Sequence, residues 1–149
     1  MSDIEWSAFV PDLQERISAS FAAQGLMSTL GAKLILVTPG EVQIALLPRP
    51  ELSQQHGYTH AGALTSVLDS ACGYAALTVA PAGFNVLTVE FKINFLRPAV
   101  ADRFVAIGKV AKAGKTLSVC QGEVIGELGS RRETIAIMQA TIINIPDNT

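Results

Sequence analysis

A long stretch almost without charge limits the folds open to this chain. Between Leu52 and Val89 the only formally charged residue is Asp69. A helix without a charged face is expected to be buried on all sides. From position 61 to 79, apolar residues recur at helical spacing and small residues fill the other face: Leu64, Val67, Leu68, Ala71, Ala75 and Val79, then Ala63, Ser66, Ser70, Gly73 and Ala76. We therefore predict a buried central helix over residues 61–79.

Alternating apolar and polar residues predict strands on both sides of this helix. The expected strands are residues 33–37, 41–47, 85–96, 103–111, 116–125 and 133–145, joined by short turns. Strict alternation in 85–96 would place Thr88 on the face opposite Leu87, Val89 and Phe91. One sheet must bury one face, and only the central helix is apolar enough to cover it. We predict an α+β fold in which an antiparallel meander wraps around that helix.

The segment before the strands predicts a short amphipathic helix within residues 1–30. Leu13, Ile17, Phe21 and Gln24 recur there at helical spacing. Pro11 suits the first turn of such a helix and Gly25 the residue just beyond its end. The length of 149 residues fits a single domain, 1–149.

Composition excludes several classes of function. The net charge is −2 and no basic cluster is longer than Arg131–Arg132, which disfavours nucleic-acid binding. No apolar run reaches the roughly 18 residues of a membrane span, and residues 1–6 do not resemble a signal peptide, so we expect a cytoplasmic protein. Cys72 and Cys120 are predicted to be reduced and buried, and no ligand cluster for a metal is present. The 49% of hydrophobic residues is high for this length, and we expect copies of the chain to cover part of that surface.

Asp69 is the first candidate for chemistry. A carboxylate on a buried helix loses several kcal/mol of solvation unless it is paired or hydrogen-bonded. A functional role would explain its presence. The alternative is a structural carboxylate that accepts hydrogen bonds from hydroxyl groups such as those of Thr65 or Tyr74.

The entry to the helix is the second candidate. Residues 54–62 contain Gly57 and Gly62, which allow close approach or unusual backbone angles. A helix start also presents unpaired backbone N–H groups and a positive dipole end. Such donors can stabilise the oxyanion that forms when a carbonyl is attacked.

The spacing of the two candidates predicts an oligomer. His60 and Asp69 are nine residues apart, about 13.5 Å along a helix axis, and lie on opposite sides. Asp69 therefore cannot reach the helix start of its own chain. A twofold dimer with antiparallel helices would place each Asp69 beside the other chain's donors. We expect a homodimer at least, and a homotetramer as its extension.

The motif residues are similar to those of a known family. The entry runs from Gln54 through Gly57-Tyr58-Thr59-His60-Ala61-Gly62 to Leu68-Asp69, and residues 88–98 follow as Thr-Val-Glu-Phe-Lys-Ile-Asn-Phe-Leu-Arg-Pro. This combination resembles the hotdog-fold acyl-CoA thioesterases of the phenylacetate-degradation (PaaI-like) type, from about Gly31 to the C-terminus. Ala61 departs from the pattern, because the family usually has glycine there. An alanine N–H can still donate, while its methyl group would narrow the acyl pocket or alter the turn.

The resemblance implies a role for each motif residue. Asp69 would act as general base or nucleophile, with the Ala61 N–H as oxyanion donor. Gln54 would orient water or the carboxylate, unless it is a solvated loop residue. His60 would hold the loop, and Thr88 would help to place water.

The resemblance also implies a substrate, a small, medium or aryl-acetyl CoA thioester hydrolysed to acid and CoA. Gly57 and Gly62 would border it, while Arg97, Lys92 and Lys115 are candidate contacts for the CoA phosphates or simply solvated. No cofactor is expected beyond the CoA of the substrate. Two alternatives stay open, a hotdog acyl-thioester dehydratase or hydratase, and a non-catalytic acyl-CoA-binding protein.

Overall fold

The computed structural model describes residues 3–148, with side chains from Asp12 onward. The order of elements is α1 (Asp3–Ala23), α2 (Gly25–Leu30), β1 (Lys33–Thr38), β2 (Glu41–Leu46), the 3-10 turn η1 (Pro50–Leu52), α3 (Ala61–Thr78), β3 (Phe84–Phe95), β4 (Arg103–Lys112), β5 (Leu117–Leu128) and β6 (Arg131–Pro146). The predicted central helix and all six strands are confirmed, with boundaries shifted by at most three residues.

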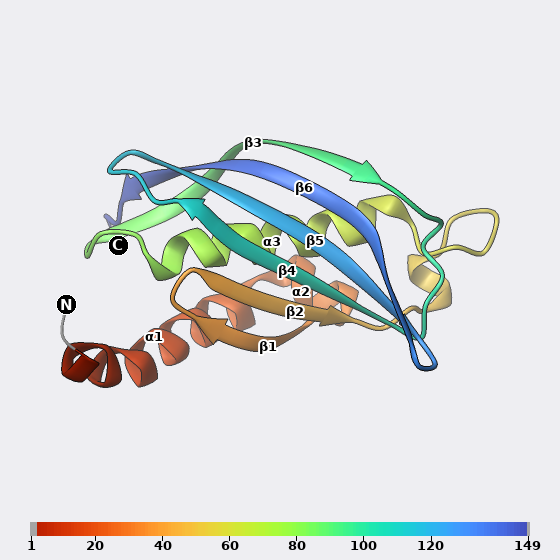
Figure 1. Cartoon of the computed structure of the whole chain (residues 1–149), viewed down its shortest axis with the longest axis horizontal. Coiled ribbons are helices and arrows are strands. Elements are labelled where there is room, and N and C mark those ends of the chain that lie inside the picture. The colour runs from red at the N-terminus through yellow and green to blue at the C-terminus, as the bar shows by residue number, and fades with distance from the viewer. Residues whose placement is uncertain (1–2, 149) are drawn as a thin grey trace.

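One curved antiparallel sheet carries all six strands and wraps around α3 (Figure 1). Its order is β1-β2-β4-β5-β6-β3. The predicted simple meander is therefore wrong for β3, which pairs with β6 at the far edge instead of with β4. Residues 96–102, which include Pro98, are too long and irregular for a tight hairpin, so β3 is free to take the partner at the other edge.

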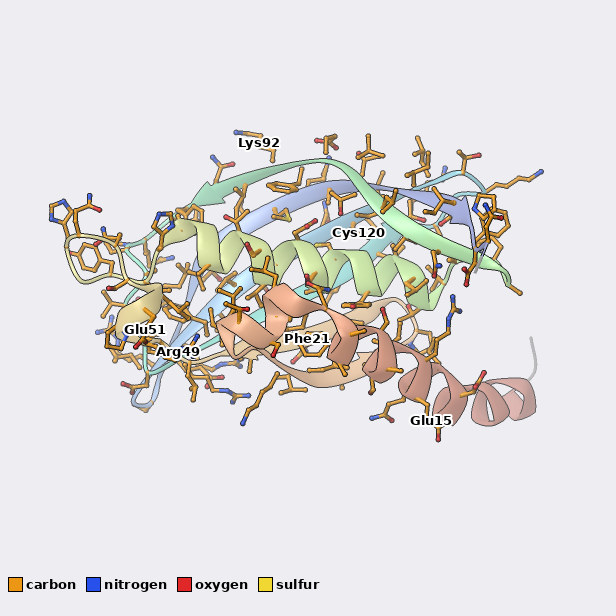
Figure 2. All side chains as sticks on the ribbon, turned by 180° about the vertical axis from the view of Figure 1, so that it is seen from behind. Glu15, Phe21, Arg49, Glu51, Lys92 and Cys120 are labelled. Atoms are coloured by element: carbon orange, nitrogen blue, oxygen red, sulfur yellow. The ribbon has the colours of Figure 1, made fainter. Side chains whose placement is uncertain are left out.

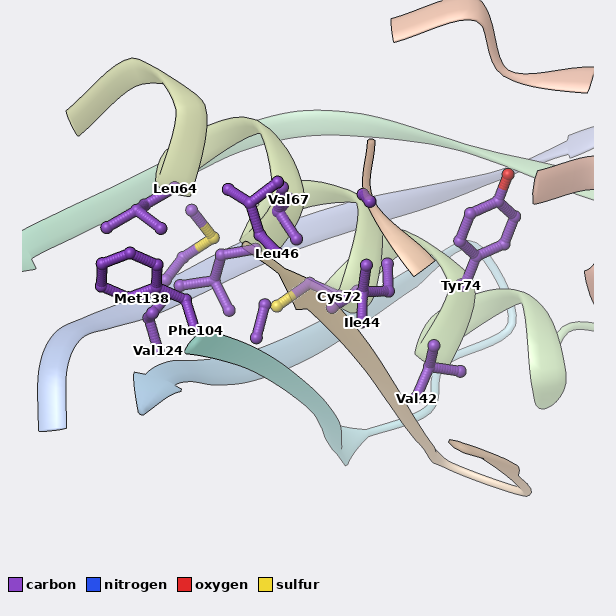
Figure 3. Close-up of a cluster of buried hydrophobic side chains, with 14 of the residues drawn as sticks. Val42, Ile44, Leu46, Leu64, Val67, Cys72, Tyr74, Phe104, Val124 and Met138 are labelled. Carbon is purple, nitrogen blue, oxygen red and sulfur yellow. The ribbon is translucent and has the colours of Figure 1, made fainter. Parts of the chain in front are cut away.

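The core lies between α3 and the inner face of the sheet (Figure 3). Leu64, Val67 and Cys72 of α3 meet side chains of β2, β4, β5 and β6, and each of the three is at most 1% exposed. Where β4 crosses α3 the strand carries Gly108, and a Cβ there would overlap the backbone of Ala71. This glycine lets the sheet lie directly on the helix.

The prediction that α3 is buried on all sides is wrong. The side that faces the sheet is buried, but Ala61 and Gly62 are exposed, and Thr65, Ser66 and Asp69 are half-buried. The sheet covers only one side of the helix and α1 covers another. The remaining side of α3 is open in the single chain.

The N-terminal helix is longer than predicted. It begins at Asp3, so Pro11 lies inside it rather than in its first turn, and Gly25 begins α2 instead of following the helix end. The preference of proline and glycine for helix ends contributes less to where a helix begins and ends than tertiary packing does. The ring of Phe21 on α1 packs against the ring of Tyr74 on α3, with the ring centroids 6.1 Å apart. In the reverse view of Figure 2, α1 lies in front of α3.

Strand β3 is an open edge with an irregular register. Thr88 pairs with Ile142 and Glu90 with Thr141, so Val89 is an extra, unpaired residue, a β-bulge. Several large apolar side chains of this edge are exposed, namely Leu87, Val89, Phe91 and Phe95. No helix within residues 3–148 is long and apolar enough to cross a membrane.

Candidate active site

Asp69 lies in the middle of α3, half-buried, on the side that the sheet leaves open. Its Oδ1 accepts a hydrogen bond of 2.8 Å from Oγ1 of Thr88 on β3. The two hydroxyl groups considered as structural partners are engaged elsewhere. Thr65 donates to the Ala61 carbonyl, and the Tyr74 hydroxyl lies 3.2 Å from Ser20 Oγ. The carboxylate is thus held from β3 and remains open to a cleft.

The bulge at Val89 aims Thr88 at Asp69. Residues paired directly across antiparallel strands lie on the same face. Thr88 is opposite Ile142 and Phe91 opposite Ala140, and both partners are fully buried on the helix side. The strict alternation predicted from the sequence is therefore wrong, because the extra residue puts Thr88 and Phe91 on one face. Without it Thr88 would point away from the helix.

The start of α3 is capped by His60. Its Nδ1 accepts a hydrogen bond of 2.7 Å from the Gly62 N–H, and its own N–H donates to the Leu52 carbonyl at 2.7 Å. A Cβ on Gly62 would lie 3.0 Å from that ring nitrogen, so the glycine leaves room for the cap. Gly57 has φ +86°, a backbone conformation that favours glycine, in the loop before the cap.

Only one N–H of the first helical turn is left without an acceptor. Gly62 donates to the His60 ring, and Ala63 and Leu64 both donate to the His60 carbonyl, at 3.0 and 3.5 Å. For the Ala61 N–H, no acceptor lies within hydrogen-bonding distance among residues 3–148. Ala61 is also exposed, so its donor can meet an oxygen atom from outside the chain.

Gln54 holds the loop that precedes the helix. Its Oε1 accepts from the backbone N–H groups of His56 and Tyr58, at 2.5 and 3.2 Å. Its backbone N–H donates to the Tyr58 carbonyl at 2.8 Å. The side-chain NH₂ is the part of the amide that these contacts leave for another partner.

The structure keeps the two halves of the candidate site apart within one chain. Ala61 and Asp69 are eight residues apart on a continuous helix, about 12 Å along its axis. The Gln54 loop and His60 lie at the Ala61 end, whereas Thr88 lies at Asp69. One substrate carbonyl group therefore cannot contact both halves of a single chain.

Asp69 opens onto a cleft of about 610 Å³ between the N-terminal helices, α3 and β3. Its polar lining includes four residues that sequence analysis did not select for the site: Ser20, Gln24, Ser70 and Asn85. Gln24 had been assigned to the helical stripe of the N-terminal segment. The signal that pointed to it was weak, since a lone glutamine ends an otherwise apolar stripe.

The three cations proposed for CoA phosphates do not come together. Arg97 follows β3 near the start of α3, where it donates to the Thr134 carbonyl at 2.6 Å. Lys115 lies in the β4–β5 turn at the other end of the sheet, and Lys92 lines an outer-face cleft of about 630 Å³. Of the three, Arg97 lies in the segment 96–102, whose Ala99 carbonyl accepts a hydrogen bond from the Thr59 N–H just before α3.

The two cysteines are reduced and buried, as predicted. Burial raises the pKa of the Cys72 thiol far above its usual range, and the nearby Cys120 and Asp69 raise it further. Burial also raises the pKa of Cys120 to about 11. Both groups are therefore neutral and poor nucleophiles near pH 7. Among the described residues, no three side chains of His, Cys, Asp or Glu gather where a metal ion would be held.

Known proteins are similar to this chain in sequence and architecture. The family model described as "Thioesterase superfamily" matches residues 56–130. A "Putative esterase" of Saccharolobus solfataricus is 33% identical over 112 residues, which are 73% of this chain and 79% of that protein. A thioesterase family protein from Silicibacter pomeroyi is 41% identical, with a TM-score of 0.87, over 90% of this chain and 98% of that one. The PaaI protein of the E. coli phenylacetic acid degradation operon shares the fold, at 22% identity and TM-score 0.80, over 89% and 93% of the two chains.

Proposed function

This chain belongs to the thioesterase superfamily and is a thioester hydrolase of the hotdog fold, and on that premise we propose that it hydrolyses acyl-CoA thioesters. The observation that carries the proposal is the Asp69 carboxylate, held by Thr88 and open to a cleft. The cleft volume of about 610 Å³ lies in the range of ligand pockets and suits a small, medium or aryl-acetyl group.

Asp69 acts on the thioester carbonyl in one of two ways. As a general base it takes a proton from water while the water oxygen bonds to the carbonyl carbon. As a nucleophile it forms a mixed anhydride that water then cleaves. In both routes the C–S bond breaks, CoA leaves as a thiolate that takes up a proton, and the acid is released. The negative charge that develops on the carbonyl oxygen meets the free Ala61 N–H.

The Asp69 and the Ala61 that form one site come from two chains. The long, exposed apolar edge β3 favours pairing with a second copy, because an open strand edge presents unpaired backbone groups. Antiparallel pairing of the two β3 strands about a twofold axis would continue the sheet. The two α3 helices would then run in opposite directions, with each Asp69 toward the other chain's Ala61.

Replacement of Asp69 by asparagine tests the function. Asp69→Asn should lower kcat for CoA release by about 10²- to 10⁴-fold, the usual contribution of a positioned acid–base group, with unchanged circular dichroism. Asp102→Asn is the matched control, because the Asp102 carboxylate also accepts one hydrogen bond, from the Gly129 N–H, but lies far from the cleft. Full thioester hydrolysis by Asp69→Asn would refute the assignment.

A further inference from the structure

The cleft at Asp69 extends along α3 away from Ala61, and the mechanism uses only its beginning. Beyond Asp69 the lining passes Gly73 and Tyr74 and reaches Leu77, with Gln24 of the N-terminal helical segment and Asn85 of β3 also lining it. The proposed mechanism uses none of these further residues, so this part of the cleft is available to the acyl group.

At Gly73 the part of the cleft beyond Asp69 is not narrowed by a side chain. It lies in the interior of α3, where glycine lowers helix stability relative to alanine. Its φ is not positive, and a Cβ built on it would meet no atom within 4 Å. Neither the backbone nor packing within the chain requires glycine there. Gly73 is one helical turn, about 6 Å, beyond Asp69 and on the same side of the helix.

A polar cluster lines the cleft beside Gly73. Ser70 Oγ donates to Oε1 of Gln24 at 2.9 Å, and Nε2 of Gln24 donates to the Tyr74 hydroxyl at 3.1 Å. These bonds fix the orientation of the Gln24 amide. Its second N–H has no acceptor among the described residues. Tyr74 is five residues beyond Asp69, about 7.5 Å along the helix axis.

We infer that this end of the cleft sets the acyl specificity: the acyl chain runs from Asp69 over Gly73, and its far end bonds to the Gln24–Tyr74 pair. The favoured thioester therefore carries a hydrogen-bonding group, such as a hydroxyl, at the far end of its acyl group. This inference rests on the proposed thioesterase function. It gives the N-terminal helical segment a direct part in substrate choice.

A pair of matched substrates tests the role of the polar groups of Gln24 and Tyr74 in the cleft. Hexanoyl-CoA and 6-hydroxyhexanoyl-CoA differ only in the terminal hydroxyl, and the ratio of their kcat/KM values cancels any loss of folded protein. The wild type should prefer the hydroxylated thioester. Tyr74→Phe and Gln24→Leu should each reduce that preference about threefold to tenfold, the range spanned by one neutral hydrogen bond. Gln14→Leu, on the part of α1 that faces β1, is the control and should leave the ratio unchanged.

Thioesters with acyl chains of different length test the depth of the cleft at Gly73. Gly73→Ala should reduce kcat/KM for hexanoyl-CoA relative to acetyl-CoA by about tenfold, a discrimination typical of one methyl-sized change in a pocket. Gly25→Ala adds a methyl group where a Cβ also meets no atom within 4 Å, but outside the cleft, and should not change the ratio.

The outcomes separate the two proposals. If the wild type releases no CoA from any of these thioesters, the proposed function fails. If it hydrolyses them but does not prefer the hydroxylated one, or if Tyr74→Phe and Gln24→Leu leave the ratio at the wild-type value, the specificity inference is wrong while the function stands.

Discussion

Replacement of Ala61 by proline would remove the proposed oxyanion donor and little else. Proline lacks the backbone N–H, and the first helical position is the one where it is favoured. The residue before proline must be extended, and His60 already has φ −62° and ψ 135°. Because the Ala61 N–H has no acceptor in the chain, no internal hydrogen bond is lost. The free energy of unfolding should stay the same or rise by about 0.5 kcal/mol.

The expected catalytic loss follows from the count of donors in the first turn. Three of the four N–H groups are engaged by His60, so the substitution leaves the developing oxyanion without a helix donor. Loss of one such donor costs about 10²- to 10³-fold in kcat. Steady-state CoA release measures the effect, and thermal unfolding followed by circular dichroism verifies the fold. Ala61→Gly keeps the N–H and should retain activity.

Mixed dimers extend the test to the two-chain site. A chain with Ala61→Pro keeps Asp69, and a chain with Asp69→Asn keeps the Ala61 N–H. Their heterodimer, purified through two different tags, should contain one intact site of two and regain about half of the wild-type kcat per dimer. Full activity of Ala61→Pro would refute the donor assignment. A heterodimer as inactive as both parents would refute the shared site.

Three further predictions follow from the Thr88 contact and from the buried cysteines. Thr88→Val keeps the shape of the side chain but removes the hydrogen bond to Asp69, so kcat should fall about tenfold, as expected for a hydrogen bond to a charged group. Thr88→Ser keeps the hydroxyl group and should retain the wild-type kcat. Equal kcat values in all three proteins would contradict a role for this hydrogen bond. Cys72 and Cys120 should react with an aromatic disulfide reagent at pH 8 only after denaturation, because their raised pKa values keep the folded thiols neutral; rapid labelling of the native protein would contradict the burial. The same pKa shifts predict that stability falls as the pH rises above the ordinary thiol pKa of about 8.5, since only the unfolded thiols then ionise.

The central helix and the strands were predictable because their patterns are local and strong. An uncharged helical stripe from residue 61 and six alternating runs identify the elements, and a single apolar helix suffices to place the sheet around it. The position of β3 was not predictable in the same way. β3 pairs with β6, a segment distant in sequence. The alternation of apolar and polar residues along a strand does not indicate which strand it pairs with.

The candidate site was predictable by residue type but not by geometry. Asp69 was marked by its isolation from other charges, and the helix entry by its glycines. The bond between Thr88 and Asp69 depends on one unpaired residue, Val89, and apolar alternation around it conceals the bulge. Gln24 was missed because it reaches the cleft from the junction of α1 and α2, through tertiary packing.

The absence of a side chain at Gly108 has a consequence for how such a site can vary. At Gly108, β4 lies directly against the backbone of Ala71, which fixes the position of α3 on the sheet at this point. The continuous helix α3 in turn sets the separation of Ala61 from Asp69, about 12 Å along its axis. In a site shared by two copies, the quantity that can vary is then the relative shift of the two α3 helices. This shift is set where the outer edges of the two β3 strands meet. Substitutions at that edge are where the reaction geometry of this chain can be retuned without disturbing its core.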